Sequence, residues 1–405
     1  MILSRCFFLW VMVCTLSIVP CLAQELTLDQ ALEAALNNSV LVSEIDSSQA
    51  QRESEARDIS ILPNPELDIE QQFYVGGAKG ASDNQPSANL NQPFRLTHLG
   101  LRSRVAELKE AAAKRGREIE LIGFIQSVRL NYAHIWVLNE RRRLLEDISS
   151  KSLKVSQFID QGYKAGAFGR GEQAIFRAEA AKIAAELQGL NAETSRANSK
   201  FISLTGFSPL KRKLAKPTIG EIPKDLISRF ADGTLKVQEQ LALLSKVASE
   251  SLNLAERDAF PELRPRLVYA HTNDGGEFYG VGISVPLPFW NRNQNAIHAA
   301  GAQKQAAEKT RIFYQSDAFK EQLIEIQSSI SSSLKELEIY ENKVLPEFQT
   351  AFAAFDQQLR AGQGATFQLW QTLNSLNDSS KTFSGLWAKT FGERAELGIL
   401  IQEDI

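Results

Sequence analysis

The sequence contains few sulfur-containing residues. All three cysteines and both methionines of the 405-residue chain lie within its first 21 positions, as Cys6, Cys14, Cys21, Met1 and Met12. We expect residues 1–23 to be a secretory signal peptide, because a basic start and an apolar run lead to small residues that end at Ala23. A chain cut after Ala23 has no thiol, which excludes disulfides, cysteine-bound metals and cysteine nucleophiles.

Cys21 leaves a second form of processing open. A lipoprotein would be cut just before this cysteine and anchored through it, but Pro20 fits that cleavage site poorly. An uncleaved anchor is disfavoured, since the apolar run of residues 6–19 is shorter than the roughly 20 residues of a membrane-spanning helix. We therefore expect an unlipidated mature N-terminus.

Long apolar runs and an excess of basic residues are missing from the rest of the chain. No stretch of roughly 18 apolar residues follows residue 23. A secreted chain of this kind is either soluble or enters an outer membrane as β-strands. The net charge of −3 gives no reason to expect a nucleic-acid partner.

Catalytic and metal-binding patterns are absent as well. The nearest match to a phosphate-binding loop, residues 169–171, lacks the lysine and the preceding strand, and no nucleophile elbow or zinc-protease motif occurs. The histidines stand at none of the usual metal-ligand spacings, and they are His98, His134, His271 and His298. We therefore expect no enzyme activity, no cofactor and no bound metal.

What the sequence does contain is helix of unusual length. Residues 99–163 include no proline, and a continuous helix there would be about 100 Å long. Its apolar residues recur every three or four positions, as in Ile125, Val128, Tyr132, Ile135, Leu138, Leu145 and Ile148. This spacing predicts a coiled-coil seam, so the helix must pack against other long helices.

The same order of elements occurs twice. The first half consists of a helix, two strands (about 67–75 and 88–96), the long helix 99–163 and another helix. The second half repeats them with strands at about 263–271 and 280–289 and a long helix at about 293–361. Residues 65–67 recur as 261–263 and residues 165–166 as 361–362, both at an offset of 196. We therefore expect an internal duplication, with repeats at 24–206 and 234–405 joined by a linker at 207–233.

The strands have the length that crosses an outer membrane when tilted. Four strands cannot close a barrel, and open edges are not tolerated in lipid. Three copies would supply twelve strands. The fold expected is thus mostly α with a small β part: a trimeric 12-stranded outer-membrane β-barrel, continued by a long periplasmic α-helical barrel.

Two local motifs carry a family resemblance. The motifs LPNPELDIE at residues 62–70 and PLPFWNRNQ at residues 286–294 resemble sequences of TolC-type outer-membrane efflux proteins, particularly of the cobalt-zinc-cadmium resistance branch. Asn295 stands where glycine is usual in that branch. The resemblance covers both repeats and implies a homotrimer in a Gram-negative outer membrane, working with a periplasmic adaptor and an inner-membrane pump.

The resemblance also implies a site, because the family has its periplasmic entrance and adaptor-docking surface at two helical tips. The matching positions here are Tyr163, Gly166 and Glu172 in the first repeat and Leu359, Gly362, Gln368 and Gln371 in the second. Some relatives carry acidic residues where this chain has the two glutamines, which puts an acidic gate ring from the second repeat in doubt. Glu172 could supply such a ring, or it could simply favour a helix N-terminus.

We expect the protein to be a passive exit duct. The PLPFWNRNQ motif favours heavy-metal cations as its cargo. One alternative is a duct with a different role, in drug efflux or type I protein secretion. The other is a soluble periplasmic coiled-coil adaptor or scaffold, although such a protein would have no need for four strands of membrane length.

Overall fold

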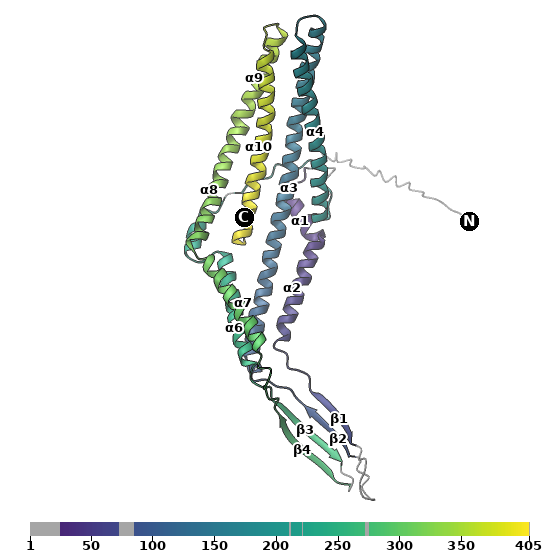
Figure 1. Cartoon of the computed structure of the whole chain (residues 1–405), viewed down its shortest axis with the longest axis vertical. Helices are drawn as coiled ribbons and strands as arrows, with labels where there is room; N and C mark the ends of the chain where they lie inside the picture. Colours follow the sequence, from purple (N-terminus) through teal and green to yellow (C-terminus); the bar gives the residue numbers. More distant parts are fainter. Residues whose placement is uncertain (1–24, 73–84, 210–211, 221, 272–274, 405) are drawn as a thin grey trace, which may run out of the picture.

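The computed structural model describes residues 25–72, 85–209, 212–220, 222–271 and 275–404, so the expected signal peptide lies outside the described residues. The chain is long and narrow, with helices along most of its length and a small sheet at one end (Figure 1). The fold is therefore mostly helical with a small β part, as expected from the sequence. Among the described residues, no helix is both long and apolar enough to cross a membrane.

The longest element is α3 (Leu101–Lys164), whose 64 residues extend about 96 Å. Six of the seven apolar residues of the expected seam are buried, and Ile125 is half-buried. α4 (Arg170–Thr205), α10 (Thr366–Ile401) and α2 (Val40–Asp58) pack along α3. The helical spacing in the sequence thus identified the face on which other helices lie.

The first helical stretch of the described chain is divided in two. A capping box begins α1 (Leu28–Asn38), because Gln30 N–H donates to Thr27 Oγ1 over 3.3 Å and Thr27 N–H donates to Gln30 Oε1. Ser39 ends it and starts α2, accepting a hydrogen bond from Leu41 N–H at 3.2 Å. The single helix expected before the first strand did not include this break, since serine is common in helices as well as at their caps.

Beyond residue 221, the described part of the chain contains six helices and one wide turn, and the first of these helices lies in the expected linker. They are α5 (Leu226–Ala231), α6 (Lys236–Arg257), α7 (Gln294–Phe313), α8 (Asp317–Ile339), the π-helical turn η2 (Tyr340–Val344), α9 (Leu345–Arg360) and α10. The expectation of one long helix over 293–361 is therefore wrong. Ser316 caps α8 by accepting a hydrogen bond from Phe319 N–H at 3.4 Å, and the ring of Tyr314 lies 4.5 Å from that of Phe319. Further along, η2 precedes Pro346, which has no N–H for a helical hydrogen bond.

The two halves of the chain contain elements of matching length and place. The helices α4 and α10 both have 36 residues and begin 196 positions apart. Each half also contributes one antiparallel pair of strands to a single sheet. The strands are β1 (Glu66–Gln72), β2 (Gln85–Asn91), β3 (Arg264–His271) and β4 (Glu277–Ser284), paired in the order β1-β2-β3-β4. The strand expected at 88–96 thus ends at Asn91, just before Pro93.

The sheet has one apolar face and one face that is polar in its β1–β2 half. Rows of paired residues on the apolar face are Leu67, Leu90, Leu267 and Val281, then Ile69, Ala88, Tyr269 and Tyr279. On the other face, Asp68 pairs with Asn89 and Glu70 with Ser87, and the same rows continue in β3 and β4 with Val268, Gly280, Ala270 and Phe278. Because no described element covers either face, the large apolar side chains are exposed.

A buried tyrosine fastens the middle of the helical part. The hydroxyl of Tyr132 shares its one proton between the main-chain oxygens of Leu26 at 2.6 Å and Ala215 at 2.8 Å. These oxygens belong to a short parallel contact between the mature N-terminus and the linker, in which Leu26 bridges Leu214. The linker therefore crosses α3 as a strap.

Candidate functional site

Two turns lie together at the end of the molecule opposite the sheet (Figure 1). In the first, the N–H of Ala167 donates to the oxygen of Gly162 at 2.7 Å and that of Gly166 to Tyr163 at 3.0 Å. In the second, the N–H of Gln363 donates to Gln358 at 3.0 Å and that of Gly362 to Leu359 at 3.1 Å. Both turns thus end a helix with the same Schellman motif, at positions 196 apart.

Glycine is required at the corner of each turn. Gly166 has φ of +78° and Gly362 has φ of +74°, the left-handed region in which a side chain is strained. A β-carbon at either position would meet no atom within 4 Å, so the requirement comes from the backbone and not from packing. The turns are therefore specified by conformation, which leaves their outer surface open.

Glu172 joins the two turns. Its Oε2 accepts a hydrogen bond from Gly169 N–H at 2.9 Å, which caps α4, and its Oε1 accepts one from the hydroxyl of Thr366 at 2.9 Å. The carboxylate is half-buried between the two repeats. The capping interpretation of Glu172 therefore describes its geometry, while a role in an acidic ring stays a prediction. Thr366 was not recognised from the sequence, because no spacing rule links residues 194 positions apart.

The remaining expected site residues divide into buried and exposed. Leu359 is only 2% exposed and belongs to the hydrophobic core of the helices. Tyr163 is 38% exposed, and Gln368 and Gln371 both lie on the exposed surface of α10. Phe367 was missed, although it is 64% exposed beside the second turn and its ring lies 5.9 Å from that of Trp370.

Charged groups surround the turns in pairs. Asp160 accepts hydrogen bonds from Arg177 at 2.7 Å and from Gln173 at 3.0 Å, and the bond from the Arg177 guanidinium lowers the pKa of the carboxyl. Arg360 is paired with Asp356 at 3.0 Å and lies over the ring of Phe158, 5.3 Å from its centre. Such exposed pairs fix side-chain positions more than they stabilise the fold.

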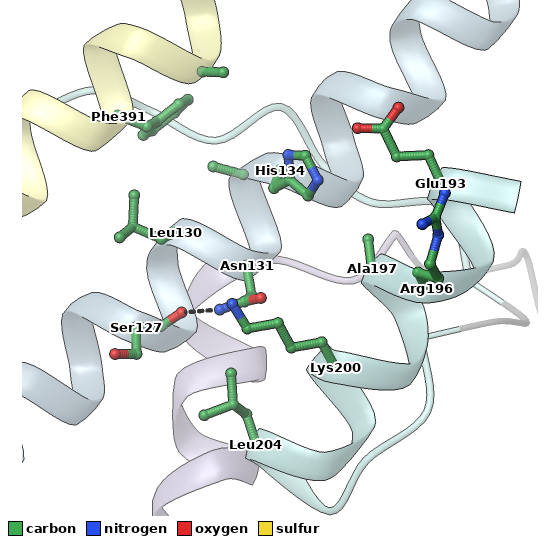
Figure 2. A pocket seen from close by; sticks show the side chains of 12 residues that line it. Ser127, Leu130, Asn131, His134, Glu193, Arg196, Ala197, Lys200, Leu204 and Phe391 are labelled. Carbon is green, nitrogen blue, oxygen red and sulfur yellow. Dashed lines mark hydrogen bonds between the residues drawn. The ribbon is translucent and has the colours of Figure 1, made fainter. Parts of the chain in front are cut away.

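A second concave region lies halfway along the helices. This hollow has a volume of about 670 Å³ and is lined by α3, α4 and α10. Figure 2 shows His134 on α3 and Glu193, Arg196 and Lys200 on α4 around it. Asn131 beside them donates to the main-chain oxygen of Ser127 at 2.7 Å. In the described part of the chain, no three histidine, cysteine, aspartate or glutamate side chains come close enough together to hold a metal ion.

The chain was compared with known proteins. No protein-family model matches it. It is 24% identical over 402 residues to the cobalt-zinc-cadmium resistance protein CzcC of Cupriavidus metallidurans, covering 93% of this chain and 90% of that protein.

Solved structures show the same fold. The outer membrane protein VceC of Vibrio cholerae superposes with a TM-score of 0.75 at 15% identity, covering 93% of this chain and 96% of that one. CusC gives 0.73 at 14% identity, with 93% and 92% covered. The open state of the MtrE outer membrane channel of Neisseria gonorrhoeae gives 0.73 at 13% identity, with 93% and 89% covered. The chain therefore shares its fold with these solved outer-membrane proteins.

Proposed function

We propose that three copies of this chain form the exit duct of a tripartite efflux system in the outer membrane of a Gram-negative bacterium. The observation that carries the proposal is the sheet, which has one apolar face and an opposite face that is polar across β1 and β2, and no described residue outside the sheet covers either face. A sheet of this kind fits a barrel wall with lipid on one side and a water-filled lumen on the other. The fold shared with CusC and MtrE supports the same conclusion.

The number of copies is argued from the edges of the sheet. β1 and β4 each have one neighbour within the chain, which leaves two open edges. Unpaired backbone groups are costly in lipid, so β1 of one copy must pair with β4 of the next. Three copies give twelve strands, an even number within the usual range.

The two helical turns are proposed as the end that meets a periplasmic adaptor and, through it, an inner-membrane pump. Their support is the position opposite the sheet and the exposure of Tyr163 and Phe367. The duct itself conducts passively, since a pump elsewhere must supply the energy. The repeats at 24–206 and 234–405, with the linker 207–233 as a strap, remain our proposed division of the chain.

Heavy-metal cations are the proposed cargo. The support is the sequence similarity to CzcC, a protein named for cobalt, zinc and cadmium resistance. Glu66, Asp68 and Glu70 also place a carboxylate at every second position of β1, on the polar face of the sheet. Rings of acidic side chains favour cations in channels.

The test has two parts. Membrane fractionation and native mass determination should find a trimer in the outer membrane, and a soluble monomer or dimer in the periplasm would revive the scaffold alternative. A deletion strain should then become sensitive to zinc, cobalt or cadmium. Sensitivity to drugs alone, or a loss of protein secretion, would assign the duct to one of the other cargoes.

A further inference from the structure

A second pocket lies where the sheet meets the helices. It has a volume of about 470 Å³ and is formed by the β2–α3 connection on one side and by the end of α6 and the α6–β3 connection on the other. Its apolar wall consists of Leu96, Leu99, Phe260 and Pro261, with Leu101 beneath. Leu99 is 75% exposed and Phe260 66%, so the chain itself leaves this wall open.

The pocket continues the apolar face of the sheet. Phe94 pairs with Leu263 in the same register that joins Leu90 to Leu267, so the alternation of faces extends beyond the ends of the two strands. Leu96 is two residues beyond Phe94 and begins a short 3₁₀ helix (Leu96–His98), so it directly follows the end of this apolar face. Since β2 and β3 are the two central strands, the pocket lies within one copy and away from the edges where neighbouring copies would meet.

The polar side of the pocket is basic. Its lining includes Arg95, Arg257 and Asn253 and no acidic side chain. Arg95 is engaged with Asp258 at 3.6 Å and Glu262 at 3.4 Å, and Asp258 also pairs with Arg102. Arg257 is exposed and, within the described residues, makes no ion pair. Its guanidinium is therefore available to an anion that comes from outside the chain.

We propose that this pocket binds an anionic phospholipid, with the headgroup phosphate on Arg257 and an acyl chain along Leu96, Leu99 and Phe260. The inference rests on the proposed function, which puts the apolar face of the sheet in lipid and the helices in the periplasm. The pocket then lies at the level of the periplasmic headgroups. A basic group beside an open apolar wall matches the two halves of a phospholipid, whereas a soluble anion would make no use of the apolar wall.

The experiment is native mass spectrometry of the complete protein, extracted from the outer membrane, stripped of lipid and supplied with either phosphatidylglycerol or phosphatidylcholine. The wild type should retain phosphatidylglycerol in preference to phosphatidylcholine. Arg257→Gln should weaken phosphatidylglycerol binding about fivefold, the effect of about one basic side chain near an anionic surface. Leu99→Ser should weaken binding of both lipids.

Arg141→Gln is the matched control, because Arg141 lies on α3 about 60 Å from its sheet end and makes no ion pair within the described residues. Equal retention of the two lipids, equal behaviour of the two arginine variants, or displacement of the lipid by inorganic phosphate would each overturn the site. The same spectrum reports the oligomeric state, so a trimer without lipid selectivity rejects only this pocket. The absence of an outer-membrane trimer rejects the proposed function itself.

Discussion

At the scale of single residues, Tyr132 shows what a sequence pattern contains and what it omits. The three-and-four spacing placed this side chain on the buried face of α3, where it is fully buried. The pattern gave no hint that its hydroxyl binds Leu26 and Ala215, because these partners are 106 and 83 positions away. A hydroxyl in a buried seam indicates only that some acceptor must be near.

Replacing Tyr132 by phenylalanine should lower the free energy of unfolding by about 1–2 kcal/mol, since two buried main-chain oxygens lose a donor. The measurement is the midpoint of thermal unfolding of the purified assembly. Tyr163→Phe is the control, because that side chain is exposed at the tip. Equal midpoints for the two variants would show that the strap is held by other contacts.

The same tyrosine predicts a response to alkaline pH. Burial raises the pKa of Tyr132 from about 10 to about 12, so the folded state retains a proton that the unfolded chain releases. This contribution to stability is fully present below pH 10 and is lost as the pH rises toward 12. A plot of unfolding midpoint against pH should therefore fall more steeply above pH 10 for the wild type than for Tyr132→Phe.

Gly362 offers a test of the tip that leaves the core intact. Gly362→Ala should cost about 1 kcal/mol through strain at φ of +74°, and should reduce adaptor binding while trimers still form. Gly171→Ala is the control, as its φ lies outside the left-handed region and its β-carbon would meet open space. Pull-down of the adaptor and the amount of trimer are the two measurements. Normal metal export by Gly362→Ala would contradict the assignment of this turn to pump coupling.

At the scale of elements, the spacing of apolar residues predicted which segments are helices or strands, and in what order, better than it predicted where a helix is interrupted. The alternation of apolar residues predicted four strands, and the helical spacing predicted α3 as one rod. The same reasoning failed at residues 314–316, because the apolar spacing continues across the break and the cap at Ser316 uses a residue that is also found inside helices. In the folded chain, the packing of Tyr314 against Phe319 fixes the break between α7 and α8, and such packing cannot be deduced from the spacing of apolar residues.

The two faces of the sheet predict opposite responses to charge. Val281→Arg, at a position that is 85% exposed on the apolar face, should cost about 2–4 kcal/mol if it faces the middle of the bilayer. Glu70→Arg on the polar face should be tolerated. The amount of trimer in the outer-membrane fraction measures both. Loss of assembly in Glu70→Arg but not in Val281→Arg would reverse the assignment of the faces.

At the scale of the whole molecule, the duplication brings together two turns that the sequence could locate but not connect. Each Schellman turn was visible as a glycine after a long helix. The contact between Glu172 and Thr366 depends on how the two halves pack, and their registers along α3 fix it. In the proposed trimeric duct, the surroundings of Glu172 would also depend on how the three copies pack, and Glu172 would occur three times around the entrance.

Two substitutions separate the alternatives for that carboxylate. Thr366→Val removes only the bond between the turns, whereas Glu172→Ala removes that bond, the cap on Gly169 and the charge. If Glu172 acts as a cap and a tie, both variants should open the channel more often in planar bilayers, and the preference for cations over anions should stay unchanged. A cation preference that falls in Glu172→Ala but not in Thr366→Val would instead assign the three carboxylates to an acidic ring, because only the charge distinguishes that outcome.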